Sequence, residues 1–524
     1  MIHLLAMSIA ETLRTRKLII PMLAVFIALL VQTSWAEEDA FITLRTSDNL
    51  IHGYGLRWNV AERVQTFTNP LWMFMLAGTH AIIKNPHLTL ILLSILVSTL
   101  AVFVVLVYVP QKNFGLLLAF SILALSKAFV DFSTSGLENP ASHLLAGCFA
   151  ALYLRSEKPI SERNLFFLSL FAGLAAFNRM DTLLFCLPAL GAMILNQPNK
   201  RNILILLAGL SPFIVWEIFA VIYYGFPLPN TYYAKLNTGV PLNESILQGV
   251  LYFVNSFGWD PITLTIIFSA LGLSFISRRR DEILLAIGIV LYLSYILYIG
   301  GDFMSGRFFS TPLIMSVILL VHRVEDASTL EKYIWISLVL FLGLILAPLK
   351  SFNNPLESDI VTFDTSTDIA DERFGYYRFS NLLLFSRSQD FQLYQFAEYG
   401  LYLKREKIPL ATIPGIGMAG YYAGPGTYII DKLGLGDPLM ARLKPADPKN
   451  WHIAHIERKV PDGYGDSIEN NENRIKDPAL AEYYDKLLLI TRGDIWSAER
   501  WEAIWKMNTG QYDYLLESFA KSQK

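Results

Sequence analysis

Long apolar runs separated by short polar loops follow one another through the first two thirds of the chain. A helix of about 20 apolar residues crosses the roughly 30 Å hydrocarbon core of a bilayer, so each run is predicted to be a membrane-spanning helix. The eleven runs cover residues 18–35, 88–108, 113–130, 139–154, 164–178, 182–196, 202–224, 260–277, 282–299, 308–322 and 332–349. The first run follows Arg14, Arg16 and Lys17 and lacks a convincing small-residue cleavage site, which favours an uncleaved helix over a signal peptide.

Basic residues collect in alternate loops, and this asymmetry sets the predicted orientation. With the N-terminus in the cytoplasm, the inside loops hold Lys112, Arg155, Lys158, Arg163, Lys200, Arg201, Arg278, Arg279, Arg280, Arg323 and Lys332. The orientation is consistent only if the run 71–83 does not cross. At about 13 residues this run is too short to span comfortably and is predicted to lie in the outer leaflet.

Two long stretches are then expected to face outward, the first outer loop 36–87 and the tail. The predicted fold is a polytopic α-helical membrane protein with a C-terminal extracytoplasmic α/β domain. Its parts are a transmembrane module, 1–350, that includes the loop, and a soluble domain, 351–524. In the tail, periodicity predicts helices over 388–404, 483–489 and 497–505 and a strand over 409–413.

Composition supports a membrane protein and argues against nucleic acid as a partner. Hydrophobic residues make up 53% of the chain and charged residues 17%, and a soluble protein has too few interior places for so much apolar surface. The net charge of −2 argues against nucleic acid, which requires a basic excess. Cys148 and Cys186 lie in apolar runs and are interpreted as small core residues.

Acidic residues stand directly after the first run, as Glu37, Glu38 and Asp39. Charge is costly near a bilayer, so ionisable residues at span ends are functional candidates. One interpretation is a solvated helix end. The other is a carboxylate that acts as a general base on an acceptor hydroxyl.

The same loop mixes glycine, aromatic and amide residues, among them Arg45, Trp58 and Asn69. Aromatic faces stack on sugar C–H groups and amides bind hydroxyls, so the mix suits a sugar-binding surface. An interfacial aromatic belt has a similar composition.

Other outward junctions also carry charge. Asp131 and Glu138 bracket one connection, and Lys235 and Arg307 work against the positive-inside trend. A bound anion such as the phosphate of a lipid-linked donor would account for the two cations. A salt bridge from Arg307 to Asp302 is an equally good and compatible explanation.

Two further features are interpreted as structural. Arg179 and Asp181 are two residues apart and are expected to form an ion pair. Gly415, Gly417 and Gly420 match G-x-G-x-x-G, but the following residues are broken by glycine and proline, so the match is interpreted as a turn and not as a dinucleotide site.

Several motifs carry a resemblance that covers nearly the whole chain in order. They are the loop 37–72 (EEDAFITLRTSDNL through TNPLW), TSGLENP (134–140), YYGFPLPNTYYAK (223–235), GGDFMSGRF (300–308) and GYYAGPGTYIIDKLGLGDPLMARL (420–443). In these residues the chain resembles bacterial polyprenyl-phosphate-dependent glycosyltransferases of the GT-C superfamily, in particular the mycobacterial terminal β-(1→2)-arabinofuranosyltransferase family.

The resemblance implies transfer of a sugar from a polyprenyl-phosphate donor to a cell-surface glycan or pilin-type glycoprotein. The leading candidate for the sugar is arabinofuranose. It assigns the catalytic carboxylate to Asp39, with Glu38 beside it, and the donor phosphate to Lys235 and Arg307. Substrate-binding candidates are Arg45, Trp58, Asn69, Glu138, Asn230, Tyr232, Asp302 and His455, and the tail adds His452 and Asp437. No cofactor or metal site is predicted. The expected partners are the donor, the acceptor and membrane lipid, and the oligomeric state is left open. The expected location is the bacterial inner membrane with the C-terminal domain outside.

Two other functions remain open. A transporter or flippase of lipid-linked glycans should show internal repeats and broken helices near the bilayer midplane, and no repeat is evident. A non-catalytic scaffold for envelope assembly would not need acids and bases clustered on one face. The clustering and the ordered motifs favour the enzyme.

Overall fold

The computed structural model of the protein describes residues 16–110, 112–236, 238–346, 363–364, 367–388, 393–448 and 451–523. The chain forms two compact units, each built from three stretches of sequence. Unit 1 comprises Met1–Glu37, His87–Phe213 and Leu242–Gln392, and unit 2 comprises Glu38–Pro86, Ile214–Pro241 and Leu393–Lys524. The predicted domain boundary at residue 350 falls outside the described residues, so that division stays a prediction.

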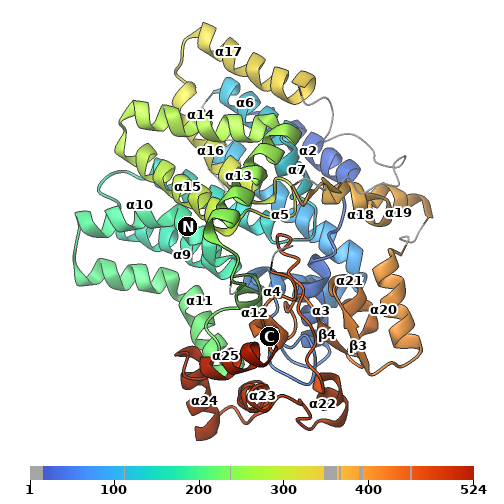
Figure 1. Cartoon of the computed structure of the whole chain (residues 1–524). Helices are drawn as coiled ribbons and strands as arrows, with labels where there is room; N and C mark the ends of the chain where they lie inside the picture. The colour runs from blue at the N-terminus through green and yellow to red at the C-terminus, as the bar shows by residue number, and fades with distance from the viewer. Residues whose placement is uncertain are drawn as a thin grey trace. The chain divides into compact units, whose positions relative to one another are not determined.

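Unit 1 is almost entirely helical (Figure 1). Its helices are α2 (Ile19–Thr33), α5 (Pro86–Tyr108), α6 (Asn113–Leu125), α7 (Lys127–Asp131), α8 (Asn139–Arg155), α9 (Glu162–Asn178), η1 (Met180–Thr182), α10 (Leu183–Asn196), the first half of α11 (Lys200–Tyr224), α13 (Leu242–Trp259), α14 (Pro261–Ser277), α15 (Arg280–Ile299), η2 (Arg307–Phe309), α16 (Ser310–Val324), α17 (Thr329–Leu340), η3 (Phe341–Leu346), α18 (Glu372–Ser380) and α19 (Leu382–Ser388). Strands β1 (Phe363–Asp364) and β2 (Ile369–Ala370) form an antiparallel pair.

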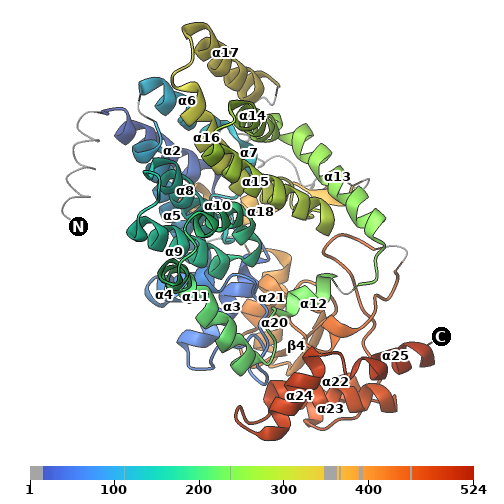
Figure 2. The same ribbon diagram turned by 90° about the vertical axis from the view of Figure 1, so that its left-hand side faces the viewer.

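Each of the eleven predicted spans coincides with helical structure within the described residues. The run 113–130 covers two helices, α6 and α7, and the last three residues of the run 332–349 lie outside the described residues. Among the described residues, five helical segments are long and apolar enough to cross a membrane, namely α5, α11, α15, Arg307–Val324 and Thr329–Leu346. The pair α13 and α14 would be a sixth only if both helices form one broken span, and the two are bent by 113° relative to each other (Figure 2). The helices α2, α4 and α6 and the segment Met180–Asn196 are apolar but shorter. The protein is a multi-pass membrane protein, and the count of eleven spans stays a prediction.

Helix α13 was not predicted, because polar residues interrupt its apolar run. It begins as Leu-Asn-Glu-Ser and carries Gln248 and Asn255, so no long apolar window stands out. Its buried residues Gly249, Tyr252 and Ser256 nevertheless lie three or four positions apart, which is the helical period. Helix α13 packs against α14 and α15, and this packing explains why one face of the helix is buried.

The central helix of unit 1 is α16. It packs against α14, α8 and α6, and nearly all its residues from Ser310 to Val321 are buried. A helix that is apolar on all sides is stable only where neighbours surround it, and α16 has this composition until His322 and Arg323 in its last turn. It therefore fixes the turn η2 that precedes it.

Ser380 and Asn381, at the junction of α18 and α19, contact the end of α2. Ser380 Oγ accepts from the Ala36 N–H at 2.8 Å, and Asn381 donates to the carbonyl of Ser34 at 2.8 Å. Beside them lie four buried charges in which Lys127 pairs with Asp131 and Asp371, and Arg373 pairs with Asp131 at 2.9 Å. Two cations balance two anions, so these buried charges are compensated. Residues 367–388, which belong to the predicted tail domain, thus pack within unit 1.

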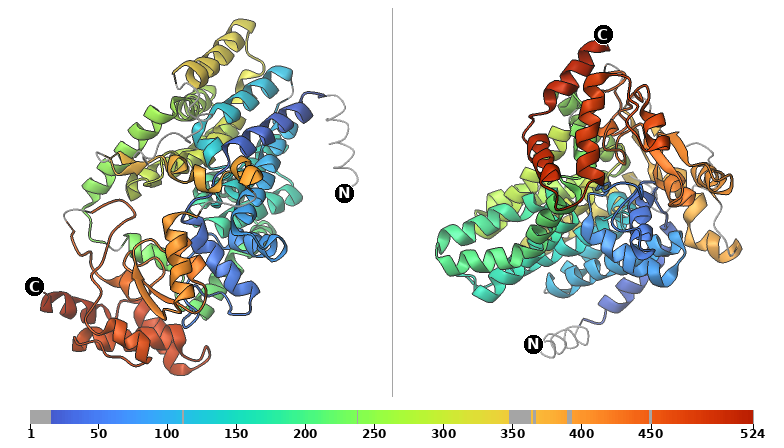
Figure 3. Two further views of the ribbon diagram at one scale, coloured as in Figure 1. Left: turned by 90° about the vertical axis from the view of Figure 1, so that its right-hand side faces the viewer. Right: turned by 90° about the horizontal axis from the view of Figure 1, so that it is seen from below.

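Unit 2 combines helices with one small sheet. Its elements are α3 (Ala40–Ile51), α4 (Pro70–Ile83), the second half of α11, α12 (Asn230–Leu236), α20 (Gln395–Arg405), β3 (Leu410–Ile413), α21 (Gly417–Ala423), β4 (Tyr428–Asp431), η5 (Met440–Arg442), α22 (Tyr464–Asn470), α23 (Pro478–Arg492), α24 (Ala498–Asn508) and α25 (Asp513–Ser522). Strand β3 and the helices over 483–489 and 497–505 confirm the predictions, and the predicted helix 388–404 is described over Gln395–Arg405. Near the C-terminus, α23 packs against α24 and α25 (red in Figure 3).

The interpretation of the glycine motif as a turn was wrong. Strands β3 and β4 pair in parallel, and α21 begins at Gly417 between them, so the segment is a strand–helix–strand unit. A Cβ on Gly417 would lie 2.0 Å from the carbonyl oxygen of Glu38, and one on Gly420 would lie 2.7 Å from the ring of Trp58. Close packing within unit 2 therefore requires these two glycines, without any bound dinucleotide.

We expect Gly417→Ala to destabilise the protein, because the added methyl group forces Glu38 and α21 apart. Overpacking of this kind costs about 1 to 3 kcal/mol of the free energy of unfolding. The matched control is Gly426→Ala, since nothing lies within 4 Å of a Cβ there, and it should change the free energy by less than about 0.5 kcal/mol. Thermal unfolding of both variants in detergent measures the difference, and equal midpoints would contradict the close contact.

Candidate active site

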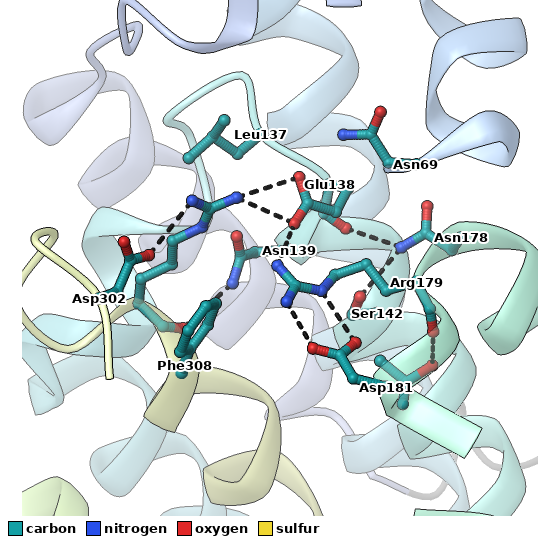
Figure 4. Close-up of polar contacts among 12 residues, drawn as sticks. Asn69, Leu137, Glu138, Asn139, Ser142, Asn178, Arg179, Asp181, Asp302 and Phe308 are labelled. Atoms are coloured by element: carbon teal, nitrogen blue, oxygen red, sulfur yellow. Dashed lines mark hydrogen bonds and ion pairs between the residues drawn. The ribbon is translucent and has the colours of Figure 1, made fainter. Parts of the chain in front are cut away.

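A cluster of buried charges lies at the ends of several helices of unit 1 (Figure 4). Its centre is Glu138, which is fully buried. Arg307 donates to the two Glu138 carboxylate oxygens at 3.1 and 3.4 Å, and Arg179 donates to one of them at 2.7 Å. Arg307 also reaches Asp302 at 3.2 Å, and Arg179 reaches Asp181 at 3.0 Å. One carboxylate thus holds two guanidinium groups, and each guanidinium has a second carboxylate.

The local sequence explains how these side chains come together. Pro140 lies in the first turn of α8, where its missing N–H is harmless, so the helix begins directly after Glu138. The loop before Arg307 turns at Gly301 and Gly306, which have φ values of +75° and +77°. A Cβ on Gly301 would lie 2.5 Å from the ring of Tyr252, so the loop packs closely on α13.

The charges of this cluster nearly balance. Three carboxylates and two guanidinium groups leave one negative charge. Burial alone would raise the pKa of Glu138, but Arg307 and Arg179 reverse the effect and hold that pKa well below its ordinary value. Glu138 is therefore an ionised structural centre and is unsuited to accept a proton near neutral pH.

Several predictions about this cluster can now be compared with its geometry. The salt bridge between Arg307 and Asp302 is confirmed, and so is the pair formed by Arg179 and Asp181. The link from Glu138 to both pairs could not be predicted from the sequence, because its partners are 41 and 169 residues away. Asp131 belongs to the separate charged group with Lys127, and Arg373 was not predicted at all.

An apolar groove of about 380 Å³ lies between α13, α14 and α15 in the same unit. It is lined by side chains such as Val250, Phe253, Phe268, Leu293 and Leu297, with Ser294 as its single hydroxyl. The ring of Phe253 contacts the ring of Phe309 edge-on at 4.6 Å between centroids. Phe309 is in the same turn as Arg307, so the wall of the groove directly contacts the segment that carries this arginine.

The predicted catalytic pair lies in unit 2 at the start of α3. Glu38 is buried, and one of its carboxylate oxygens accepts from the Met418 N–H at 2.9 Å, at the first turn of α21. Asp39 is only partly buried, and no residue in the described part of the chain donates a hydrogen bond to its carboxylate. Burial and the neighbouring Asp39 raise the pKa of Glu38 above its ordinary value. The Glu38 carboxyl is thus held by a hydrogen bond and kept neutral, while the Asp39 carboxylate is accessible and accepts no hydrogen bond from a described residue.

Four predicted substrate residues instead have contacts typical of structural residues. Arg45 is buried 4.1 Å above the ring of Trp58 and donates to the carbonyls of Gly420 and Thr427 at 2.9 and 3.0 Å. Trp58 is completely buried, so it has no free face for a sugar. Asn230 donates to three carbonyls of the segment 434–437, and Asp437 binds the N–H groups that begin η5. These contacts contribute to the packing of unit 2, and the roles of the four residues in substrate binding stay predictions.

Other predicted residues of unit 2 are accessible. Lys235, Tyr232, His452 and His455 have exposed side chains, and Lys235 forms no ion pair with any described residue. Asn69 is buried at the start of α4, where its side-chain oxygen accepts from Thr43 at 3.2 Å. Lys235 and Arg307 belong to different units, so their shared role in phosphate binding stays a prediction.

Within the described ranges, no group of three or more histidine, cysteine, aspartate or glutamate side chains is placed to hold a metal ion. The prediction of no cofactor is not tested by this observation and stays a prediction, and the sequence left the requirement for a divalent metal open.

Comparison with solved structures defines the class of fold. The chain resembles ArnT from Cupriavidus metallidurans, solved with bound undecaprenyl phosphate, with a TM-score of 0.50 and 12% sequence identity. The likeness covers 81% of this chain and 88% of that chain. No family model matches the sequence.

Comparison with curated proteins then gives particular relatives. The chain is 25% identical to the terminal β-(1→2)-arabinofuranosyltransferase of Mycobacterium tuberculosis, over 82% of each protein. It is also 25% identical to the protein of the same name from Corynebacterium glutamicum, over 53% of this chain and 46% of that protein. The resemblance predicted from the sequence motifs is confirmed.

The raised pKa of Glu38 has a measurable consequence for stability. A carboxyl whose pKa is raised in the folded state contributes stability that is present below its ordinary pKa and is lost as the pH rises through the raised value. Glu38→Gln keeps a neutral group at every pH. The unfolding midpoint of this variant should match that of the unmodified protein at about pH 4 and exceed it at about pH 9.

The control for this measurement is Glu398→Gln, which changes an exposed glutamate of α20. Its midpoint should follow that of the unmodified protein over the whole pH range. If the Glu38→Gln curve were also parallel to the unmodified one, the carboxyl would not be neutral in the folded state.

Proposed function

We propose that the protein is a membrane glycosyltransferase that moves a sugar from a polyprenyl-phosphate donor to an acceptor outside the cytoplasm. The leading candidate for the sugar is arabinofuranose. The observation that carries the proposal is the pair at the start of α3, in which Glu38 is held by α21 and Asp39 is left free to react. The similarity to two proteins named terminal β-(1→2)-arabinofuranosyltransferase supports the sugar and the reaction type. The undecaprenyl phosphate bound to ArnT supports the class of donor.

In the proposed reaction, Asp39 takes the proton of the acceptor hydroxyl while the hydroxyl oxygen attacks the anomeric carbon of the donor. A new glycosidic C–O bond forms as the bond from the anomeric carbon to the phosphate oxygen breaks. The bonding electrons leave with the polyprenyl phosphate, so no nucleotide and no oxidation step are needed. Glu38, neutral and bound to the Met418 N–H, positions the start of α3 and adds no negative charge beside the base.

The donor is proposed to bind through its two chemically different parts. The exposed Lys235 has no carboxylate partner among the described residues and is available to a lipid phosphate. Arg307 is the second phosphate candidate, and its two carboxylates hold its guanidinium in a fixed orientation. The apolar groove of α13, α14 and α15 suits the isoprenoid chain, because its wall contacts the turn that carries Arg307.

Asp39→Asn should abolish most transfer, because the amide keeps the size of the side chain but cannot accept a proton. General-base catalysis is worth about 100- to 10,000-fold, so the turnover number should fall by that factor. Glu38→Gln should cost much less, since a neutral group is already present there. The measurement is transfer from a synthetic polyprenyl-phosphate arabinofuranose to short arabinofuranose oligomers by purified protein.

Asp466→Asn is the matched control, an exposed aspartate at the start of α22 that should leave transfer unchanged. A loss that is larger in Glu38→Gln than in Asp39→Asn would move the base to Glu38. Normal transfer by a variant that lacks both carboxyls would refute the proposed mechanism.

Lys235→Ala should weaken donor binding without changing the chemistry, because one charge-assisted contact to the phosphate is lost. Such contacts are worth about 1.5 to 3 kcal/mol, so KM for the donor should rise by about 10- to 100-fold. Lys404→Ala, an exposed lysine of α20, is the control. Arg307→Lys should retain only part of the activity of the unmodified protein, since the planar guanidinium that binds Glu138 and Asp302 is lost. An unchanged KM in Lys235→Ala would place the phosphate elsewhere.

A further inference from the structure

A small cavity lies where three segments of unit 2 meet. The first outer loop contributes Gln65, α12 contributes Asn230, and the end of α23 contributes Thr491. Backbone hydrogen bonds join the same segments, from the Asn230 N–H to the Gln65 carbonyl at 2.8 Å and from the Arg63 N–H to the Thr491 carbonyl at 3.0 Å. The cavity leaves about 10 Å³ for the centre of a water-sized ligand, which is room for one small particle.

Two buried arginines line this cavity. The exposed fractions of Arg63 and Arg442 are 6% and 8%. Arg63 donates to the carbonyls of Ile490 and Gly493, and Arg442 donates to the Pro438 carbonyl at 2.7 Å and to Asn230 Oδ1 at 3.1 Å. Each guanidinium still has a buried nitrogen that finds no hydrogen-bond partner among the described residues, Nε of Arg63 and Nη2 of Arg442.

No carboxylate compensates these two charges. Neither arginine forms a salt bridge with any residue that the structure describes, and none of the described residues that line the cavity is acidic. Asp494 is close enough to influence Arg63 but is not within ion-pair distance of it. The guanidinium of Arg442 instead lies between the rings of Phe226 and Tyr233, 4.2 and 4.5 Å from their centroids. Burial of an unpaired cation is costly, and the penalty falls when an anion is bound beside it.

We propose that this cavity binds a monatomic anion, chloride under ordinary conditions, held between Arg63 and Arg442. The cavity has room for about one water-sized particle, which is too little to enclose a phosphate or a sugar. A water molecule would fit, but it would leave both positive charges uncompensated. The unpartnered N–H groups and the uncompensated charge together point to an anion, and this assignment does not depend on the proposed enzymatic activity.

The position of the cavity indicates what the anion would do. Asn230 begins α12, and its side chain is bonded to Arg442 and to the segment 434–437. The same helix carries Lys235 one and a half turns later. A bound anion would therefore hold the first outer loop, α12 and the tail of unit 2 together, and halide concentration would affect the stability of this unit.

Thermal unfolding of the purified full-length protein in sodium chloride and in sodium gluconate of equal ionic strength tests the proposal. Chloride should raise the unfolding midpoint by about 2 to 4 °C, and the shift should saturate as a single binding site requires. Arg442→Gln should have the same midpoint in both salts. Arg458→Gln is the matched control, because Arg458 is equally buried but binds the carbonyls of Leu433 and Ile456 away from the cavity, so this variant should keep the chloride shift.

Bromide keeps the test decisive if Arg442→Gln fails to fold. Crystals of the unmodified protein grown in sodium bromide should show an anomalous scattering peak beside Arg442 Nη2 and Arg63 Nε. A water molecule at that place, or equal midpoints in chloride and gluconate, would overturn the proposal. A chloride shift that persists in Arg442→Gln would also overturn it, because the ion would then bind elsewhere.

Discussion

The arrangement of unit 1 depends on the ionised carboxylate of Glu138. This buried group holds Arg179 and Arg307, and through them the beginnings of α10 and α16 and the loop that contains Asp302. Removal of one partner from a buried ion pair leaves an uncompensated charge, which costs about 3 to 5 kcal/mol. The helices that enter this cluster are therefore coupled electrostatically as well as by apolar packing. The ring of Phe308, 4.9 Å from Arg179 and 5.7 Å from Arg307, covers both cations.

Unit 2 stabilises its buried cations in a different way. Arg45, Arg458 and Arg500 donate to backbone carbonyls and have no carboxylate partner among the described residues. Arg500 of α24 caps the C-terminal end of α11 by donating to the carbonyls of Ile222 and Tyr223. Carbonyls at a helix end lack partners within the helix and carry partial negative charge, so they suit a guanidinium group. This use of arginine joins segments that are distant in sequence without needing an acidic partner for each.

The sequence predicted best what depends on local pattern. The apolar runs and the periodicity of the tail located long helices of unit 1, β3 and the helices near the C-terminus, because each depends on neighbouring residues. Helix α13 was missed because its buried stripe is narrow and its other positions are mixed. The strand–helix–strand segment around Gly417 was misread because tertiary contacts with Glu38 and Trp58 explain its glycines, and local turn chemistry does not.

The candidate site shows the same limit more sharply. Charge at span ends singled out Glu138, Asp302 and Arg307 as functional candidates. The structure places all three in one buried ion-pair cluster, and their roles in substrate and phosphate binding stay predictions. The pair of Arg179 with Asp181 was expected from their spacing and is confirmed. The sequence could not show that Arg45 and Trp58 stack on each other below the surface, or that the Asn230 side chain binds backbone carbonyls and the guanidinium of Arg442. A residue type and its place in a loop indicate which functional groups are present. Only the contacts show whether those groups are already bound to other parts of the protein.

The hydrogen bond from Met418 to Glu38 also has a consequence for biosynthesis. Its two residues are 380 positions apart in the chain. A ribosome that adds about 5 to 20 residues per second needs about 20 to 80 s to make the stretch between them. During that interval the carboxyl pair has left the ribosome without the helix that holds it. A chain that ends prematurely, before α21, would insert its membrane helices yet never assemble the pair, so the unit that carries Asp39 matures only when synthesis is nearly complete.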